Sequence, residues 1–213
     1  MNNTEILTVD NYYSQEMNKK YMSVSQLKGF MTCEAREMAK LSGKYTPADT
    51  TALLQGKLLE TLLLEPNKVE QFMGENPELF MKNGSLKSDH RKVLEMVERA
   101  KKDKVFMDFI GDDFTSYYQH LVHGEIGGIE FKGLIDIYQP GVRIVDLKGV
   151  KDFAPIWDNN KGKKLNFISY WGYDMQLAVY QELLRQTTGE DLPVYIAGIT
   201  KESVSDIGIF EIP

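Results

Sequence analysis

The sequence predicts an α/β domain in which a central β-sheet is covered by α-helices. In the first half of the chain, apolar residues recur at the three- and four-residue spacing of amphipathic helices. From Gly124 on they alternate at the two-residue spacing of strands, and one further helical stretch interrupts these strands. This order of helices, strands, helix and strands is typical of a sheet flanked by helices. The length of 213 residues suits one domain, expected over residues 21–213 after an irregular segment at residues 1–20.

The first helix is expected over roughly residues 24–41. Ser23 and Gln26 have the spacing of a capping box, in which each side chain satisfies the other residue's backbone N–H. Apolar residues then recur at helical intervals until Gly43 offers a stop. Cys33 lies within this segment and is expected to be a packed thiol.

Two further helices are expected before the strands. The second begins at Asp49 or Thr50 and ends before Pro66, because proline cannot continue a helix interior. Leucines fall on most of its circumference, which predicts a helix buried in the core. The third covers about residues 88–105 and follows a connection rich in glycine, proline and asparagine. We allow this helix to continue, after a break, into residues 112–124.

Strands dominate the second half of the chain. Residues 128–150 alternate as two strands joined by a turn at residues 138–141, which makes them the clearest hairpin in the sequence. A helix at residues 169–189 follows and ends at a glycine. Two more strands are expected at residues 193–202 and 206–213.

The composition excludes several classes of protein. With 42% hydrophobic and 26% charged residues, the chain is neither disordered nor fibrous. Its most apolar stretch, residues 51–66, is broken by polar and charged residues and falls short of the ~20 apolar residues of a membrane span. No secretory signal is evident, so we expect a cytoplasmic protein. The single cysteine, Cys33, excludes an internal disulfide and a four-cysteine iron–sulfur cluster within one chain.

The charge balance limits how this protein can bind nucleic acid. Its net charge is −6 and its pI is near 5.2, the wrong sign for a protein that binds nucleic acid over its whole surface. Lysines cluster at residues 99–104 and 159–167, but such runs are usually solvated faces. Any nucleic-acid binding is therefore expected to be local.

Three charged residues, Asp136, Asp146 and Lys148, lie in the otherwise apolar hairpin. Burying a charge is costly unless it is paired, hydrogen-bonded or bound to a metal. With the turn centred near Pro140, Asp136 faces Ile144 and lies diagonal to Asp146 on one face of the sheet. Two carboxylates so placed can share one Mg²⁺, and with a lysine they suit phosphodiester hydrolysis. A structural ion pair is the alternative.

These residues resemble the core motif of the PD-(D/E)XK nuclease superfamily, an aspartate on one strand and (Asp/Glu)-x-Lys on the next. Asp136 and "DLK" at residues 146–148 match it. More of the chain, over about residues 21–212, is similar to the RecE-type (exodeoxyribonuclease VIII-like) exonucleases of phages and prophages. The similar segments, in the same order, are "MSVSQLKGFMTCEAREMAKLSG", "LLQGKLLETLLLEP", "FKGLIDIY", "GYDMQLAVYQELL" and "ITKESVSDIGIFEI". The resemblance implies a restriction-endonuclease-like fold, with a mixed sheet flanked by helices and a helical N-terminal part.

The resemblance also implies a site for Mg²⁺, with Mn²⁺ as a substitute. Asp136 and Asp146 would bind the metal, and the backbone carbonyl of Leu147 would add a ligand. Lys148 would position the attacking water or balance charge. Glu60 would supply a further ligand, at a position where many RecE-type members have histidine and phage lambda-type exonucleases have glutamate. Whether one or two metal ions act stays open.

Three helical residues complete the candidate site: Glu60, and the secondary candidates Gln176 and Tyr180. Glu60 lies on a helical wheel between Gly56 and several leucines, where an unpaired carboxylate is costly, and a salt bridge to a lysine is the alternative. Gln176 and Tyr180 are one helical turn apart. The resemblance implies that they face the active site and hold the catalytic carboxylate or the DNA backbone. The alternative for Tyr180 is a core aromatic at helical spacing.

Contacts with DNA are expected from Lys161, Lys163 and Lys164, because related nucleases place the helix that follows the motif lysine beside DNA. His120 and His123 are three residues apart on an expected helix. They are weaker metal candidates, since no matching carboxylate or cysteine is evident in the sequence.

The expected activity is Mg²⁺-dependent exonucleolytic cleavage of linear double-stranded DNA ends, which exposes single strands for a phage annealing protein. Such an enzyme would be encoded by a phage or prophage and would act in the cytoplasm of the bacterial host. A ring of three or four subunits would gather modest basic patches in a channel while its exterior stays acidic. The alternatives are an endonuclease or resolvase of the same superfamily, and a non-catalytic nuclease-like protein that binds DNA ends or inhibits a host defence enzyme.

Overall fold

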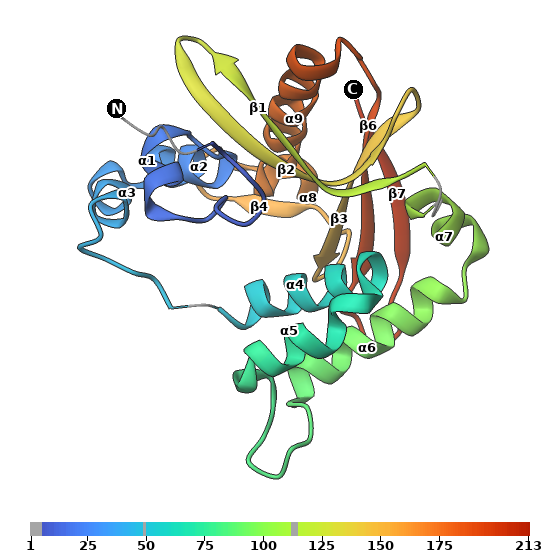
Figure 1. Cartoon of the computed structure of the whole chain (residues 1–213). Coiled ribbons are helices and arrows are strands. Elements are labelled where there is room, and N and C mark those ends of the chain that lie inside the picture. Colours follow the sequence, from blue (N-terminus) through green and yellow to red (C-terminus); the bar gives the residue numbers. More distant parts are fainter. Residues whose placement is uncertain (1–5, 49, 112–114) are drawn as a thin grey trace.

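A five-stranded mixed sheet forms the centre of the computed structural model, which describes residues 6–48, 50–111 and 115–213 (Figure 1). The strand order is β1-β2-β3-β6-β7, with β3 and β6 parallel and the other neighbours antiparallel. The strands of this sheet are β1 (Tyr117–Ile126), β2 (Ile129–Gln139), β3 (Arg143–Val150), β6 (Val194–Thr200) and β7 (Ile207–Ile212). A separate two-stranded sheet consists of β4 (Ile156–Asp158) and β5 (Lys163–Leu165). The mixed sheet confirms the predicted fold class.

The helices fall into an N-terminal group, a middle group and a C-terminal pair. The N-terminal group is α1 (Gln15–Lys20), α2 (Val24–Thr32) and α3 (Glu34–Leu41). The middle group is α4 (Thr51–Leu64), α5 (Val69–Glu75), α6 (Ser88–Lys101) and α7 (Lys104–Ile110), with short 3₁₀ turns at η1 (Pro66–Lys68) and η2 (Pro77–Leu79). The C-terminal pair is α8 (Phe167–Trp171) and α9 (Tyr173–Thr188).

Helices cover both faces of the sheet (Figure 1). On one face, α4, α6 and α7 pack against Val145 and Leu147 of β3. On the other face, Ile144 of β3 packs against Leu177 and Leu184 of α9. Successive residues of β3 therefore point into opposite cores, as strand alternation requires. Because β3 is buried on both sides, charged residues on it must find partners inside the protein.

The N-terminal segment packs onto β2 as a third, smaller core formed by Leu7, Tyr12, Met17 and Leu134. Lys132 lies beside it and is completely buried. Its ammonium donates hydrogen bonds to the backbone carbonyl of Tyr12 and to Asn18 Oδ1, the second at 2.8 Å. The ammonium also lies 4.5 Å from the centre of the Tyr12 ring. A buried charge thus attaches the N-terminal segment to the central sheet.

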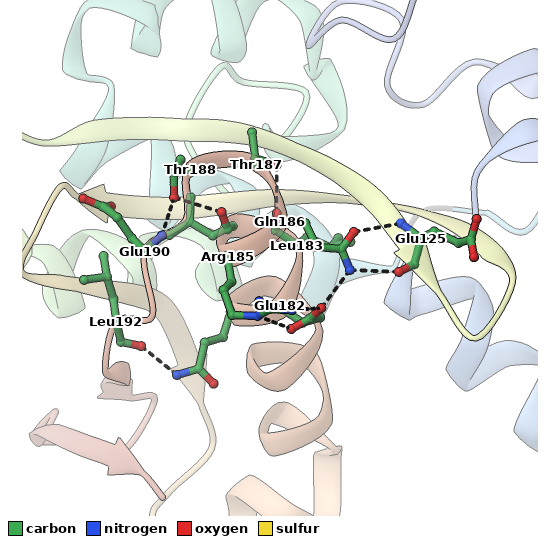
Figure 2. Close-up of polar contacts among 11 residues, drawn as sticks. Glu125, Glu182, Leu183, Arg185, Gln186, Thr187, Thr188, Glu190 and Leu192 are labelled. Atoms are coloured by element: carbon green, nitrogen blue, oxygen red, sulfur yellow. Dashed lines mark hydrogen bonds and ion pairs between the residues drawn. The ribbon is translucent and has the colours of Figure 1, made fainter.

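The C-terminal turn of α9 is attached to the edge strand β1 by polar side chains (Figure 2). The side-chain amide of Gln186 donates to the carbonyl of Glu125 at 2.8 Å and accepts from its N–H at 3.0 Å. Glu182 accepts further hydrogen bonds from Gln186 and Arg185, each at 2.8 Å. A Cβ at Gly124 would lie 2.2 Å from Gln186 Oε1, so a larger residue there would displace this contact. These bonds fix α9 against the sheet.

The N-terminal helices differ from the predicted ones in two places. Part of the segment at residues 1–20, expected to be irregular, forms α1. The single helix expected over residues 24–41 is broken at Cys33, whose extended backbone ends α2 and begins α3. The break lets Glu37 fold back onto Gly29, where a Cβ would lie 2.2 Å from the Glu37 carboxylate. Cys33 is consequently exposed and not packed.

The strand β1 occupies the region where a helix over residues 112–124 was allowed, so that prediction was wrong. β1 pairs with β2 from Tyr117 opposite Tyr138 to Ile126 opposite Ile129, and this hairpin pairing overrides the helical pattern of its residues. Residues 112–114 lie outside the described residues, as does Asp49, one of the two expected starts of the second helix. Thr50, the other expected start, caps α4 by accepting a hydrogen bond from the N–H of Leu53 at 3.2 Å.

Candidate active site

A cleft of about 450 Å³ opens where α4, β2, β3 and α9 meet, with β1 and the N-terminal segment completing its walls. The predicted site residues that line it are Glu60, Asp136, Leu147, Lys148, Gln176 and Tyr180. Asp146 lies beneath the surface of the cleft and is only 1% exposed. The fold thus brings together side chains that are up to 120 residues apart in the sequence, from Glu60 to Tyr180.

The register between β2 and β3 differs from the expected one. Tyr138, and not Asp136, lies opposite Ile144. The paired residues end with Ile137 opposite Val145, just before Asp136. The prediction failed because the turn is centred one residue later, near Gly141, whose φ of 70° suits glycine. Instead of facing a residue of β3, Asp136 accepts a hydrogen bond through Oδ2 from the N–H of Leu147 at 2.9 Å.

Asp136 also marks a change of face within β2. Ile135 packs with the α9 cluster, whereas Ile137 packs with the α4 and α6 cluster, although alternation would place both on one face. On β1, Gln119 lies at the level of Asp136 and has a φ of 50°, which is uncommon for residues other than glycine. Gln119 Nε2 lies 3.4 Å from Asp136 Oδ1. Backbone strain of this kind clusters at functional sites.

Asp146 and Lys148 form the second part of the site. The Lys148 ammonium lies 2.6 Å from Asp146 Oδ2 and 3.8 Å from Asp136 Oδ2, so it balances two buried carboxylates. Asp146 Oδ1 accepts a hydrogen bond from Gln176 Nε2 at 3.1 Å. Although it touches the ammonium, Asp146 Oδ2 is buried and has no hydrogen-bond partner in acceptable geometry. Lys148 is therefore the ion-pair partner of this oxygen, and a metal ion would have to share the oxygen with the ammonium or displace it.

The electrostatics of the site depend on burial and on this cluster of charges. Burial raises the pKa of Asp136 to about 7, and the nearby Asp146 carboxylate acts in the same direction against the opposing charge of Lys148. Burial alone would lower the pKa of Lys148. The negative charges of Asp146, Asp136 and Glu60 outweigh this effect and raise the pKa above the usual range of a lysine. Lys148 is therefore a permanent cation, whereas Asp136 lies close to its ionisation point at neutral pH.

Glu60 projects from α4 into the cleft and is half-buried. Burial, together with the neighbouring charge of Asp136, raises its pKa to about 8. Within the described ranges, no lysine or arginine nitrogen lies at ion-pair distance from Glu60, so the structure does not contain the alternative salt bridge. A carboxyl group held in this way needs a proton or a cation as its partner.

The donor set suits a divalent cation with oxygen ligands. The carboxylates of Asp136 and Asp146 are adjacent, and the Leu147 carbonyl oxygen lies 3.4 Å from Lys148 Nζ at the same place. Asp146 Oδ2 makes no hydrogen bond in acceptable geometry, which leaves this oxygen a lone pair for a cation besides its ion pair with Lys148. Over the part of the chain that the structure describes, no three His, Cys, Asp or Glu side chains group closely enough to hold a metal. The role of Glu60 as a third carboxylate ligand thus stays a prediction.

Gln176 and Tyr180 occupy the places that the sequence indicated. Both line the cleft, and Gln176 Nε2 lies 3.3 Å from the Tyr180 hydroxyl as well as contacting Asp146. Tyr180 also packs in the core between α9 and β2, so both interpretations of this aromatic residue describe it. A Cβ at Gly133 would lie 2.8 Å from the Tyr180 ring, which therefore rests directly on the β2 backbone.

Comparison with known proteins identifies the family. The family model described as a PDDEXK-like domain of unknown function (DUF3799) matches residues 23–213. The chain belongs to this PDDEXK-like family. Membership confirms the resemblance that was inferred from Asp136 and "DLK", and with it the expected nuclease-like architecture of a mixed sheet flanked by helices.

Among solved structures, the PDDEXK-like chain is similar to a protein from Eubacterium rectale named "Putative exonuclease". The two share 40% sequence identity and a TM-score of 0.91, over 98% of this chain and 79% of the other. A second structure, SSO0001, aligns with 13% identity and a TM-score of 0.32 over 83% of this chain and 73% of the other, values too low to indicate a shared fold. No curated protein matches the sequence. The family and the first neighbour together support a nuclease function.

The three lysines expected to contact DNA lie on the β4–β5 hairpin of the PDDEXK-like domain. Lys161, Lys163 and Lys164 are exposed, and none of them lines the central cleft. Lys161 lines a neighbouring cleft together with Tyr170 and Trp171. No ion pair within the described ranges neutralises these lysines, so their charges are available to phosphates. Their contact with DNA stays a prediction.

Several residues of the site could not be found from the sequence. Gln119 was overlooked because its segment was interpreted as helical, and Tyr12 and Tyr13 because theirs was considered irregular. His120 and His123, weighed as metal ligands on a helix, lie on β1 instead. Both pack beside aromatic rings: the ring centre of His120 lies 4.7 Å from that of Tyr138, and the ring centre of His123 lies 5.9 Å from that of Tyr21.

Within the described residues, no helix is long and apolar enough to cross a membrane.

Proposed function

We propose that this PDDEXK-like protein is a metal-dependent exodeoxyribonuclease that hydrolyses phosphodiester bonds at the ends of linear double-stranded DNA. One observation carries the proposal: Lys148 and the two carboxylates Asp136 and Asp146 converge in a cleft. The neighbour named as an exonuclease, at 40% identity, supports the choice of reaction.

PDDEXK nucleases generally use divalent metals, and Mg²⁺, with Mn²⁺ as a substitute, would here polarise the phosphate and activate water. Asp136, Asp146 and the Leu147 carbonyl would hold this metal. The N–H of Leu147 and the amide of Gln119 hold the Asp136 carboxylate, and Gln176 holds Asp146. Each carboxylate is thus oriented before substrate arrives, which is the condition for electrostatic preorganisation.

Lys148 supplies the positive charge of the site. Its ammonium is held between two aspartates and is only 18% exposed at the side chain, so it is shielded from bulk water. In such a setting a cation stabilises the charge that develops on a phosphate more strongly than it would in solvent. It would also hold the attacking water by hydrogen bonding. We assign Lys148 these two roles.

Glu60 and Asp136 set the charge of the site before metal binds. Because burial raises their pKa values to about 8 and about 7, the metal-free site at neutral pH contains fewer negative charges than its three carboxyl groups would carry in water. Metal binding is therefore expected to release protons, as it does wherever ligands must ionise. Proton release measured on Mg²⁺ addition would support a metal role for these groups.

The wider role proposed is in phage or prophage recombination within a bacterial cytoplasm, where the protein would resect DNA ends for a single-strand annealing protein. An overall charge of −6 requires local DNA contacts, and Lys161, Lys163 and Lys164 are the proposed ones. Assembly into a ring trimer or tetramer would concentrate these charges around DNA. A monomer in light scattering would contradict the ring.

End-labelled linear duplex tests the function. Wild type should release nucleotides in Mg²⁺ or Mn²⁺ and not in EDTA, whereas Lys148→Ala should lose activity. Lys102→Ala is the matched control, because Lys102 is an exposed lysine just after α6 and does not line the cleft. Absence of release by wild type would refute the enzyme, and full activity of Lys148→Ala would refute the site. Cleavage of covalently closed circles would indicate an endonuclease instead.

A further inference from the structure

Two large aromatic side chains lie exposed at the end of α8, beside the active-site cleft. Trp171 is 53% exposed and Tyr170 is 36% exposed. Their ring centres are 4.9 Å apart at an angle of 87°, so each ring supports the other edge to face. A partner that covers rings of this size removes apolar surface from water, which is favourable. Their position suggests what that partner is.

The backbone places this aromatic pair next to the catalytic residues. Gly172 has a left-handed φ of 63°, which ends α8 and lets the chain turn into α9. Tyr173, on the other side of this turn, lines the cleft, and the Lys148 ammonium lies 5.6 Å from its ring. Lys28 braces the turn, because its ammonium donates to the Trp171 carbonyl at 3.0 Å and lies 5.4 Å from the Tyr173 ring. The pair is thus held two or three residues from a side chain of the active site.

Two surface clefts meet at the aromatic pair. One, of about 600 Å³, shares Ala52, Gly149, Tyr173 and Lys201 with the central cleft, so the two are continuous. The other, of about 640 Å³, lies on the far side of the same rings. Tyr170 and Trp171 line both. A chain that leaves the active site along this surface therefore passes over these two rings.

The charged residues around the pair are mainly basic. The cations that line the two clefts are Lys28, Lys151, Lys161 and Lys201, and the acids are Asp152 and Asp174. Asp152 is partly neutralised by Lys151 at 3.4 Å. The local charge along these clefts is thus opposite in sign to the net charge of −6. Lysines for phosphates and rings for bases are the two elements of a single-strand binding surface.

We infer that Tyr170 and Trp171 form a stacking platform for unpaired nucleotides of DNA next to the scissile bond. Inside a duplex both faces of each base are already stacked, so only a terminal or unpaired base has a free face for Trp171. The platform therefore selects substrates whose end is single-stranded or opened. This inference rests on the proposed nuclease function for its substrate and names the class of DNA end that the site prefers.

Binding in EDTA, where no cleavage occurs, tests the platform. A short fluorescein-labelled oligothymidylate and a blunt duplex of equal length are titrated, and anisotropy is measured. Trp171→Ala should weaken single-strand binding about 5- to 150-fold, the range for losing one base–aromatic stack, and duplex binding much less. Tyr45→Ala is the matched control, because Tyr45 is 46% exposed and lines neither these two clefts nor the central one. Wild-type binding by Trp171→Ala, or an equal loss in Tyr45→Ala, would overturn the inference.

Tryptophan fluorescence gives a second readout, which reports on the Trp171 ring itself. The chain contains two tryptophans, so Trp157→Phe leaves Trp171 as the single one. In this variant, oligothymidylate should quench the emission of Trp171 by stacking on its ring. In the anisotropy experiment, Trp171→Phe should retain most of the single-strand binding, because phenylalanine keeps an aromatic ring. A surface that serves a protein partner would give no quenching with DNA, and that result would contradict the platform.

The platform and the proposed function fail in different ways. If wild type binds and quenches but releases no nucleotides in Mg²⁺, the nuclease function fails and the binding surface stands. If wild type cleaves while Trp171→Ala binds single strands and cleaves open and blunt ends at wild-type rates, the platform fails and the nuclease stands.

Discussion

Gln176 Nε2 donates a hydrogen bond to Asp146 Oδ1 at 3.1 Å, and this contact joins α9 to the central strand β3. The same amide nitrogen lies 3.3 Å from the Tyr180 hydroxyl one helical turn away. Since Lys148 contacts the other oxygen of Asp146, the carboxylate is held from two sides. We therefore propose Gln176 as a positioning residue, which acts through the carboxylate and not on the substrate.

Gln176→Ala is expected to lower metal affinity about 10- to 100-fold, the usual cost of removing a group that orients a ligand. Calorimetric titration with Mn²⁺ measures this loss without any need for activity. Gln71→Ala is the control, because Gln71 is exposed and contacts Glu75 on the same helix. Equal affinities of Gln176→Ala and wild type would remove the positioning role.

Gln119→Gly separates backbone strain from the contact with Asp136. The left-handed φ of 50° at Gln119 costs a non-glycine residue about 1 kcal/mol, so glycine should leave the free energy of unfolding unchanged or higher. Losing the amide 3.4 Å from Asp136 Oδ1 should nevertheless weaken metal binding. Urea unfolding and Mn²⁺ titration measure the two effects. A variant that is less stable and binds metal normally would contradict this account.

Gly133→Ala is expected to destabilise the protein by about 1–3 kcal/mol, the usual cost of overpacking. The added methyl would lie 2.8 Å from the ring of Tyr180, which is buried and cannot swing aside. Gly74→Ala is the matched control, since a Cβ there meets nothing within 4 Å in the helix α5. Helix propensity predicts that this control is stabilised by roughly 0.5–1 kcal/mol. Urea unfolding would confirm both expectations if the free energy of unfolding falls in Gly133→Ala and rises in Gly74→Ala.

Lys132 should make stability depend on pH in the alkaline range. Burial lowers its pKa to about 8 in the folded protein, from 10.5 in the unfolded chain. Between these values the unfolded chain binds more protons, so the free energy of unfolding rises with pH, by up to about 1.4 kcal/mol per pH unit. Above pH ~10 the buried Tyr12, whose pKa burial raises, acts in the opposite direction.

The measurement compares wild type with Lys132→Met by urea unfolding between about pH 8 and pH 9.5, a window set by these pKa values. The variant is less stable throughout, because Tyr12 and Asn18 lose their donor. The stability advantage of wild type over the variant should nevertheless grow with pH. A constant difference would show that Lys132 does not titrate in this window.

The sequence predicted the residues of the site better than their geometry. Charges on a hairpin apolar on both faces were enough to bring Asp136, Asp146 and Lys148 together, because alternation and burial act locally. The partner of Ile144 was missed by two residues, since the turn is centred one residue later, at Gly141, and β2 changes face at Asp136. Both features depend on packing against two different helical layers, which no local pattern encodes.

The contribution of β1 was missed because its residues were interpreted as helical. The Gly127-Gly128 pair between β1 and β2 is nevertheless a hairpin signal, and both glycines have a positive φ. Pairing with β2 makes these residues a strand and brings the amide of Gln119 to Asp136. Gln119 could therefore be recognised as a site residue only once its strand was placed beside β2.

The smallest of the three cores has a dynamic consequence. Leu7, Tyr12, Met17 and Leu134 form the cluster that anchors residues 6–20, and Tyr12 and Tyr13 from this segment line the active-site cleft. Besides this cluster, the buried Lys132 holds the segment through Tyr12 and Asn18. Because its apolar core is the smallest of the three, the segment is expected to open locally before the central sheet unfolds. Amide hydrogen exchange in residues 6–20 should then be faster than in β3 and should slow when DNA occupies the cleft. Local opening of this wall would expose the candidate active site while the sheet stays folded.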